Sequence, residues 1–450
     1  MISLAKLVKA TMRINDNSYI DKSLVLSKIP KIAGKLSNKT LAQLENEGVF
    51  IFPEGVKNSE DLSSDQMVLQ SINDRYFTGN VMGFLGFGKE RLTIASRFAQ
   101  NDSDYFLQYM LDKVLDFPNI FDLQTGSNKN NQLINVLMFL FPLYLKSAMR
   151  KGLFKNYINV EYNDANLKGS INIARHIKQN TPFVGKIAYN QREQSLDNYM
   201  SQLIRHTIEY IKQKPNGTLI LARAKDDVQR IVEVTGQYKF QDRKRIIADN
   251  KKHTIRHAYF REYRALQHLC ILILQHQKHE LGSGSTNVYG VLFDGAWLWE
   301  EYIDTLVRKA FYHPKNKAKS DAQWLFSSER KVGLIYPDFI SKNANERVIA
   351  DAKYKPFENI GGQDYLQLLA YMLRFDSKRG LYFYPESTEK DNTYLWINRG
   401  TTYEKNVARR DDAFIIKHGL KIPDDARNYN EFSLKMKAAE KDFIATLANF

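Results

Sequence analysis

The stretch YPDFISKNANERVIADAKYK, residues 336–355, is typical of two short strands joined by a polar turn. Side chains two positions apart in a strand share a face, so Asp351 and Lys353 point the same way. Pro337 lacks a backbone N–H and interrupts regular strand pairing just before Asp338. A hairpin between the two strands therefore brings Asp338 close to Asp351.

Carboxylates held close together predict a cation site. Mg²⁺ takes oxygen ligands, a metal-bound water is a better nucleophile, and a lysine beside it stabilises charge on a phosphate. Asp338, Asp351 and Lys353 therefore favour phosphodiester hydrolysis. The alternative is a surface hairpin carrying one weak Asp–Lys ion pair. The apolar flanks of VIADAKY argue against that alternative, because a buried charge needs a partner.

Three further residues are candidates for the same site. Glu300, in the expected helix FDGAWLWEEYIDTLVRKAF, stands at the edge of the apolar stripe, whereas Glu301 points more toward solvent. Spacing alone leaves open whether Glu300 reaches a metal. Gln367 and Tyr371 lie four positions apart, on one face of a second expected helix. They either support the site or contact DNA, or else Tyr371 packs with its hydroxyl at the rim.

The chain as a whole is strongly basic. Its 450 residues carry a formal net charge of +15, which favours a polyanionic partner such as nucleic acid. The densest basic stretch, with interleaved aromatic residues, spans residues 238–264. The alternatives are a solvated linker between helices and a face that docks on an acidic partner. The predicted DNA-contact residues in this stretch are Arg243, Lys244, Arg245, Lys251, Lys252 and Arg256.

The order of patterns predicts a mixed α/β (α+β) protein in three regions. We expect a β-rich N-terminal region at residues 1–155, a mainly helical region at 156–284, and a mixed sheet flanked by helices at 285–450. The small and polar stretch LGSGSTN, residues 281–287, marks the main boundary. In the last region we expect helices at 294–312 and 363–376, strands at 322–327, 331–340, 346–355, 379–385 and 393–397, and a closing charged helix.

Several classes of protein are disfavoured. Cys270 is the single cysteine, so neither an internal disulfide nor a cysteine zinc site is expected. The most apolar run, residues 133–145, is 13 residues long and contains Pro142, which is too short to span a bilayer. The N-terminus lacks the apolar core of a signal peptide. A cytoplasmic protein with no membrane partner is therefore expected.

The stretch GFLGFGKE, residues 83–90, resembles a phosphate-binding loop only in part. Its G-x-x-x-x-G-K spacing is followed by Glu90, where such a loop needs a Ser or Thr hydroxyl for Mg²⁺. The next residues, RLTIASRF, alternate as a strand does. We therefore expect a β-turn here and no nucleotide bound by this chain.

The spacing of P-D, D-A-K and Q-x-x-x-Y resembles the PD-(D/E)xK nuclease superfamily in its glutamine–tyrosine variety. More narrowly, the chain resembles the McrC family, the endonuclease subunits of McrBC-type, GTP-dependent restriction systems. LWEEYI, YPDFI, IADAKYK and DYLQLLAY match that family's C-terminal pattern. LKGSINIARHI and PFVGKIAYNQREQSLDN resemble its middle part. The resemblance covers most of residues 75–400.

The resemblance implies an endonuclease that cuts double-stranded DNA with one or two Mg²⁺ ions. Glu300, Asp338 and Asp351 become metal ligands, and Lys353 becomes the catalytic lysine, with Gln367 and Tyr371 as supporting residues. It also implies a McrB-type AAA+ GTPase hexamer as partner, which uses the GTP and contacts the N-terminal region, and it leaves room for pairing of complexes through the nuclease domain. Two alternatives stay open: a mainly non-catalytic assembly and activation factor, and a stand-alone nuclease.

Overall fold

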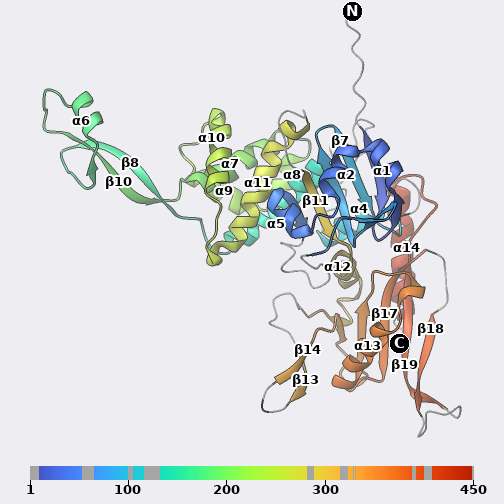
Figure 1. Cartoon of the computed structure of the whole chain (residues 1–450). Helices are drawn as coiled ribbons and strands as arrows, with labels where there is room; N and C mark the ends of the chain where they lie inside the picture. The colour runs from blue at the N-terminus through green and yellow to red at the C-terminus, as the bar shows by residue number, and fades with distance from the viewer. Residues whose placement is uncertain are drawn as a thin grey trace, which may run out of the picture. The chain divides into compact units, whose positions relative to one another are not determined.

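The computed structural model divides the chain into two compact units (Figure 1). The first unit combines residues 1–127 with residues 284–450, and the second consists of residues 128–283. The mixed α+β class expected from the sequence is confirmed. The expected linker at 281–287 lies outside the described residues. The structure describes residues 10–52, 65–99, 105–115, 132–280, 288–314, 323–327, 329, 331–387, 392–399 and 408–447.

A five-stranded mixed sheet forms the N-terminal part of the first unit. Strand β11 pairs antiparallel to β6 and parallel to β3. Because β11 follows residue 284, this sheet combines strands from both segments of the first unit. The strand after the expected boundary thus joins the N-terminal sheet, where all six of its residues are buried. In sheet order the strands are β1 (Thr11–Asn15), β7 (Glu90–Ala95), β6 (Val81–Phe87), β11 (Tyr289–Asp294) and β3 (Val49–Phe52).

The GFLGFGKE stretch forms the hairpin between β6 and β7, as its pattern predicts. Phe87 pairs with Glu90, and Gly88 adopts a left-handed conformation with φ of 56°. The Glu90 carboxylate accepts a hydrogen bond of 2.8 Å from the backbone N–H of Ile32, in the first turn of α2. The residue that spoils a phosphate-binding loop therefore satisfies a helix N-terminus instead.

Short strands and helices complete this part of the unit. Strands β2 (Tyr19–Asp21), β5 (Arg75–Thr78) and β4 (Leu69–Ile72) form an antiparallel sheet of three strands. Many apolar side chains of the following helices are buried in a core with the five-stranded sheet. These helices are α1 (Lys22–Lys28), α2 (Pro30–Leu36) and α3 (Leu41–Glu47). Helix α4 (Tyr105–Val114) follows later in the chain and packs on α12 (Gly295–Val307) and α14 (Tyr429–Leu447).

A six-stranded mixed sheet forms the C-terminal part of the first unit. Strands β16, β17 and β19 run parallel, and the remaining pairs are antiparallel. The 14-residue strand β19 was not expected from the sequence, because its first half is a run of charged residues. In sheet order the strands are β12 (Phe311–Tyr312), β15 (Phe339–Ser341), β16 (Val348–Ala352), β17 (Arg379–Glu386), β19 (Ala408–Lys421) and β18 (Thr393–Arg399).

The strand expected at residues 331–340 is divided in two. Its first half, β14 (Lys331–Ile335), pairs with β13 (Gln323–Ser327) in a separate ribbon, and its second half becomes β15. Pro337 lies at the break, where the missing N–H ends regular pairing. Helices α12 (Gly295–Val307) and α13 (Gln363–Arg374) pack on the sheet at β16, and α14 (Tyr429–Leu447) packs on β19.

The second unit is a helical bundle from which a β-ribbon extends (Figure 1). The ribbon pairs β8 (Asn156–Asp164) with β10 (Ile187–Ser195), and β9 (Ser170–Ile171) and α6 (Ile173–Gln179) lie at its far end. No helix in the described part of the chain is long and apolar enough to cross a membrane. The bundle contains α5 (Gln132–Met149), α7 (Tyr199–Lys212), α8 (Gly217–Ala222), α9 (Lys225–Val234), α10 (Arg243–Lys252) and α11 (Arg261–Glu280).

Candidate active site

The hairpin of β15 and β16 places Asp338 beside the end of β16. Phe339 pairs with Ala350, so the next positions along the two strands are Asp338 and Asp351. The backbone N–H of Ala352 donates a hydrogen bond of 2.8 Å to Asp338 Oδ2. The break at Pro337 frees Asp338 from the regular ladder, and its carboxylate turns to the neighbouring strand instead.

Asp351 and Lys353 extend from the same face, as strand alternation predicts. Lys353 Nζ lies 2.7 Å from Asp351 Oδ2, and the exposed fractions of the two side chains are 16% and 2%. A second carboxylate, on Asp364 of α13, has its Oδ1 3.9 Å from the same Nζ. The lysine is therefore surrounded by negative charge at a place with little access to water.

The pKa values of Asp338 and Lys353 are shifted by the charges of the neighbouring side chains. Burial raises the pKa of Asp338 well above its ordinary value, and the negative charges of Glu300 and Asp351 raise it further. Burial alone lowers the pKa of Lys353, but the Asp351 and Asp338 carboxylates outweigh it, so the pKa of Lys353 is raised. The lysine is consequently charged at neutral pH.

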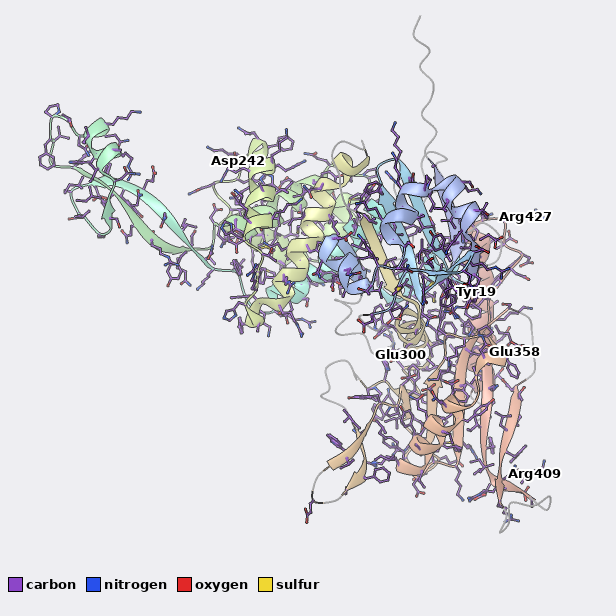
Figure 2. The ribbon with its side chains drawn as sticks, viewed as in Figure 1. Tyr19, Asp242, Glu300, Glu358, Arg409 and Arg427 are labelled. Atoms are coloured by element: carbon purple, nitrogen blue, oxygen red, sulfur yellow. The ribbon has the colours of Figure 1, made fainter. Side chains whose placement is uncertain are left out.

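Glu300 lies on α12, where it is labelled in Figure 2. Asp294 caps the N-terminus of this helix, and its carboxylate accepts hydrogen bonds from the backbone N–H groups of Ala296 and Trp297. Glu300 is close enough to raise the pKa of Asp338. By contrast, Glu301 Oε1 accepts a hydrogen bond of 3.1 Å from Trp297 Nε1 on its own helix. Glu300 is thus the α12 carboxylate that acts on Asp338.

Gln367 and Tyr371 form a short hydrogen-bond chain that ends on the lysine. Lys353 Nζ donates to Gln367 Oε1 at 3.1 Å, and Gln367 Nε2 donates to the Tyr371 hydroxyl at 2.8 Å. Tyr371 is buried, and burial raises its pKa to about 12, with the Asp351 and Asp338 charges adding to the effect. Lys353 Nζ therefore has Gln367 as a second partner besides Asp351.

Two further residues near the site, His313 and Asp364, are not predicted from the sequence. His313 Nδ1 donates to the backbone oxygen of Asp338 at 2.8 Å, and its Nε2 lies 3.6 Å from Glu300 Oε1. Asp364 accepts hydrogen bonds of 2.9 Å from Lys355. Helical spacing gives a signal for Asp364, which stands one turn before Gln367. His313 has no such signal, because it lies 25 positions from Asp338 in irregular chain.

The chemistry of these donors fits a hard divalent cation. Carboxylate oxygens are the ligands that Mg²⁺ prefers, and a cation would relieve the repulsion that raises the pKa of Asp338. Among the described residues, no group of three His, Cys, Asp or Glu side chains is already arranged to hold a metal ion. The charges of Glu300 and Asp351 thus both act on Asp338, but the three described carboxylates are not arranged as the ligands of one metal ion.

The basic residues expected to contact DNA lie in the second unit, on α10 and just after it. Arg243 is half-buried, with its guanidinium 4.7 Å from the ring of Phe240, and Arg245 pairs with Asp242 at 2.8 Å. These two arginines therefore have contacts within the bundle. The exposed members of the expected set besides Arg245 are Lys244, Lys251, Lys252 and Arg256.

The six-stranded mixed sheet and its flanking helices are consistent with a nuclease-like α/β fold. The chain belongs to the family described as McrBC 5-methylcytosine restriction system component, whose sequence model matches residues 77–385. This match confirms the McrC-type resemblance seen in the sequence. No curated protein matches the chain.

Two of the solved structures that are similar to the chain are McrBC assemblies. One is a refined half-complex from a tetradecameric assembly of Thermococcus gammatolerans McrB AAA+ hexamers with bound McrC. It has 14% sequence identity and a TM-score of 0.46, covering 98% of this chain and 99% of that chain. The other is the Thermococcus gammatolerans McrBC complex, with 13% identity, a TM-score of 0.31, and coverage of 66% and 87%. Both TM-scores are below 0.5, so the family assignment rests on the sequence match.

Proposed function

We propose that this chain is the Mg²⁺-dependent DNA endonuclease subunit of a McrBC-type restriction complex. The observation that carries the proposal is the position of Lys353. Its Nζ contacts both Asp351 and Gln367, and the charge of the buried Asp338 helps to raise its pKa. A charged lysine beside crowded carboxylates is suited to a phosphodiester, because negative charge grows on the phosphate during hydrolysis. Membership of a restriction-system family is in line with DNA as the substrate.

Each residue has a role in this proposal. Glu300, Asp338 and Asp351 would hold one or two Mg²⁺ ions, and bound Mg²⁺ supplies Lewis-acid chemistry for the phosphate and its attacking water. Lys353 keeps its proton and places positive charge toward the developing phosphate charge. Gln367 fixes the direction of the lysine side chain, and Tyr371 fixes Gln367.

We further propose a McrB-type AAA+ GTPase hexamer as the partner, because the similar Thermococcus structure is described as McrB hexamers with bound McrC. The partner supplies the GTP hydrolysis. In this chain the partial phosphate-loop pattern forms the β6–β7 hairpin, with Glu90 in place of the Ser or Thr hydroxyl that a phosphate-binding loop needs. Double-stranded DNA is the expected substrate of the assembled complex in the cytoplasm, and the net charge of +15 favours that polyanion.

The test is a cleavage assay on the chain purified with its GTPase partner, with GTP, Mg²⁺, and methylated or unmodified DNA. Asp351→Ala is expected to abolish cleavage and to leave stimulation of GTP hydrolysis intact. The matched control is Asp425→Ala, which removes a carboxylate that pairs with Lys435 beyond the sheet. Cleavage at the wild-type rate by Asp351→Ala would show that the site is assigned wrongly.

The same assay separates the two other functions that the sequence leaves open. Stimulated GTP hydrolysis by the wild-type complex, without any Mg²⁺-dependent cutting, would make the chain an assembly and activation factor. Cutting by the isolated chain in the absence of nucleotide would make it a stand-alone nuclease. The buried carboxylates around Lys353 favour a catalytic role over the first of these.

A further inference from the structure

Tyr354 follows Lys353 directly and points away from the candidate site. Strand β16 ends at Ala352, and the backbone N–H of Lys353 donates to Phe383 O at 2.8 Å. Lys353 therefore stands just beyond the last residue of its strand. The next side chain, Tyr354, is 4% exposed and is buried against the N-terminal sheet of the same unit.

The N-terminal sheet forms a closely fitted socket for the Tyr354 ring. The Tyr354 hydroxyl and Ser96 Oγ are 2.6 Å apart, and the hydroxyl lies 3.3 Å from Met82 Sδ. Phe98 meets the ring edge-on, with the ring centroids 5.1 Å apart. A Cβ added at Gly295 would lie 3.0 Å from the ring, so the socket has no spare room at the start of α12.

Arg97, the charged residue that contacts the Tyr354 ring, is held in place by its own partners. The Arg97 guanidinium lies 4.9 Å from the centre of the Tyr354 ring. Its NH2 group lies 2.6 Å from Asp16 Oδ2 and donates to Asn80 Oδ1 at 2.7 Å. Asp16 is fully buried, and losing one partner of a buried ion pair is costly. The ring of Tyr354 is therefore held by groups that have little freedom of their own.

We propose that Tyr354 is a positioning residue, through which the N-terminal sheet sets the place of Lys353. The proposal rests on the catalytic function proposed above for that lysine. Adjacent residues share a peptide bond, so a shift of the Tyr354 ring moves the backbone from which Lys353 extends. Lys353 Nζ must meet Asp351 at 2.7 Å and Gln367 at 3.1 Å at once, which leaves little tolerance for such a shift.

The first test is Tyr354→Phe, which removes the hydroxyl and keeps the ring. In the full-length chain, the acylation rate of Lys353 by an amine-reactive ester is measured by mass spectrometry, with Lys435 as the internal reference. We expect acylation of Lys353 to rise several-fold, because a displaced amine loses its pairing with Asp351. In the complex with the partner, kcat for DNA cleavage should fall while KM stays unchanged.

The matched control is Tyr263→Phe. Tyr263 is buried in the second unit, and its hydroxyl donates to Gly152 O at 2.6 Å. This variant loses one buried tyrosine hydroxyl without touching the socket, and it should leave Lys353 acylation and cleavage as in the wild type. Equal changes in both variants would indicate a general loss of stability and would overturn the proposal.

A second variant tests the hydroxyl contact from the other side. Ser96→Ala removes the partner oxygen, and it also removes the acceptor of the Phe98 backbone N–H. If the contact acts as one unit, the double variant with Tyr354→Phe should change Lys353 acylation no more than the larger single change. Lys353 acylation at the wild-type rate in Tyr354→Phe and in Ser96→Ala would overturn the proposal.

The acylation readout needs neither DNA nor Mg²⁺. If the wild-type complex never cuts DNA while Tyr354→Phe still exposes Lys353, the proposed function fails and the positioning stands. If the wild-type complex cuts DNA while both socket variants leave Lys353 acylation and kcat unchanged, only the positioning fails.

Discussion

The end of β16 and helix α10 carry the same kinds of charged residue in different surroundings. Lys353 and Asp351 lie 2.7 Å apart, with exposed side-chain fractions of 16% and 2%. Arg245 and Asp242 lie 2.8 Å apart, with exposed fractions of 64% and 33%. The separations are nearly equal, so the distance does not distinguish the two pairs. Burial does, because water screens the pair at the start of α10 and hardly reaches the pair at the strand end.

The largest expected effect comes from breaking the buried pair. Lys353→Ala should lower the free energy of unfolding by about 3 kcal/mol in metal-free buffer, because the Asp351 carboxylate stays buried after losing the lysine ammonium that pairs with it. Arg245→Ala should change it by about 1 kcal/mol or less. Urea unfolding of both variants measures the difference. Equal losses would mean that burial does not separate the two regions.

A second prediction concerns acid stability beneath the basic residues of α10. Burial and the positive charge of Arg243 lower the pKa of His206 to about 4. The other charges acting on His206 are those of Asp242, which opposes the shift, and of Arg205 and Arg245, which add to it. As the pH falls, the unfolded state therefore takes up the proton first. The contribution of the neutral His206 to the free energy of unfolding is fully present above about pH 6.5 and is lost as the pH falls toward 4.

Between about pH 7 and pH 5, this histidine should cost about 2 kcal/mol of unfolding free energy. His206→Phe keeps a ring beside Tyr238, whose centroid is 4.7 Å away, and removes the titrating group. Urea unfolding at the two pH values should show a smaller acid loss in this variant. His418 in the first unit also has its pKa lowered to about 4 and remains in both proteins as the internal comparison. An unchanged acid loss would contradict the prediction.

A third prediction tests the support of the lysine. Gln367→Ala removes the acceptor of Lys353 Nζ and should reduce kcat for DNA cleavage by about tenfold, the scale typical of residues that orient an active-site group. Gln363→Ala, one turn earlier on the same helix, is the control and should have no effect. If both variants cut DNA equally well, the hydrogen-bond chain through Gln367 has no part in catalysis.

The smallest expected effect comes from exposed basic residues of α10 and of the segment just after it. Replacing Lys244, Lys252 and Arg256 together by Ala should lower the salt dependence of DNA binding by about 0.9 in log–log slope for each phosphate contact that is lost. An unaltered slope would favour the solvated surface or the partner-docking face. The control removes the same charge from exposed lysines of the first unit, with Lys28, Lys31 and Lys89 changed to Ala.

The sequence predicts the site better than it predicts the sheets. Strand alternation places Asp351 beside Lys353, and Pro337 signals the break that frees Asp338; both are local effects of the backbone. The neighbour of a strand is a long-range property. YGVLFD shows that β11 is buried, but nothing in it indicates a place between β6 and β3. Charged residues at 409–412 hide the start of β19, since charge is typical of solvated chain.

His313 and Tyr354 show the same limit within the site. His313 reaches Asp338 only because β12 pairs with β15, and two-residue strands leave almost no pattern. Tyr354 is an alternating residue in VIADAKY, and Ser96, the partner of its hydroxyl, lies 258 positions earlier. Contacts of this kind depend on the packing of distant elements, which a single sequence does not specify.

Strand β11 has a consequence for how the molecule can be divided. It belongs to a sheet whose other strands precede residue 127, so the second unit is an insertion within the first and not a segment that precedes it. Cutting the chain between 127 and 284 would remove an inner strand from the sheet and leave both fragments incomplete. Exchanging residues 128–283 as a cassette between relatives is the division that this topology permits.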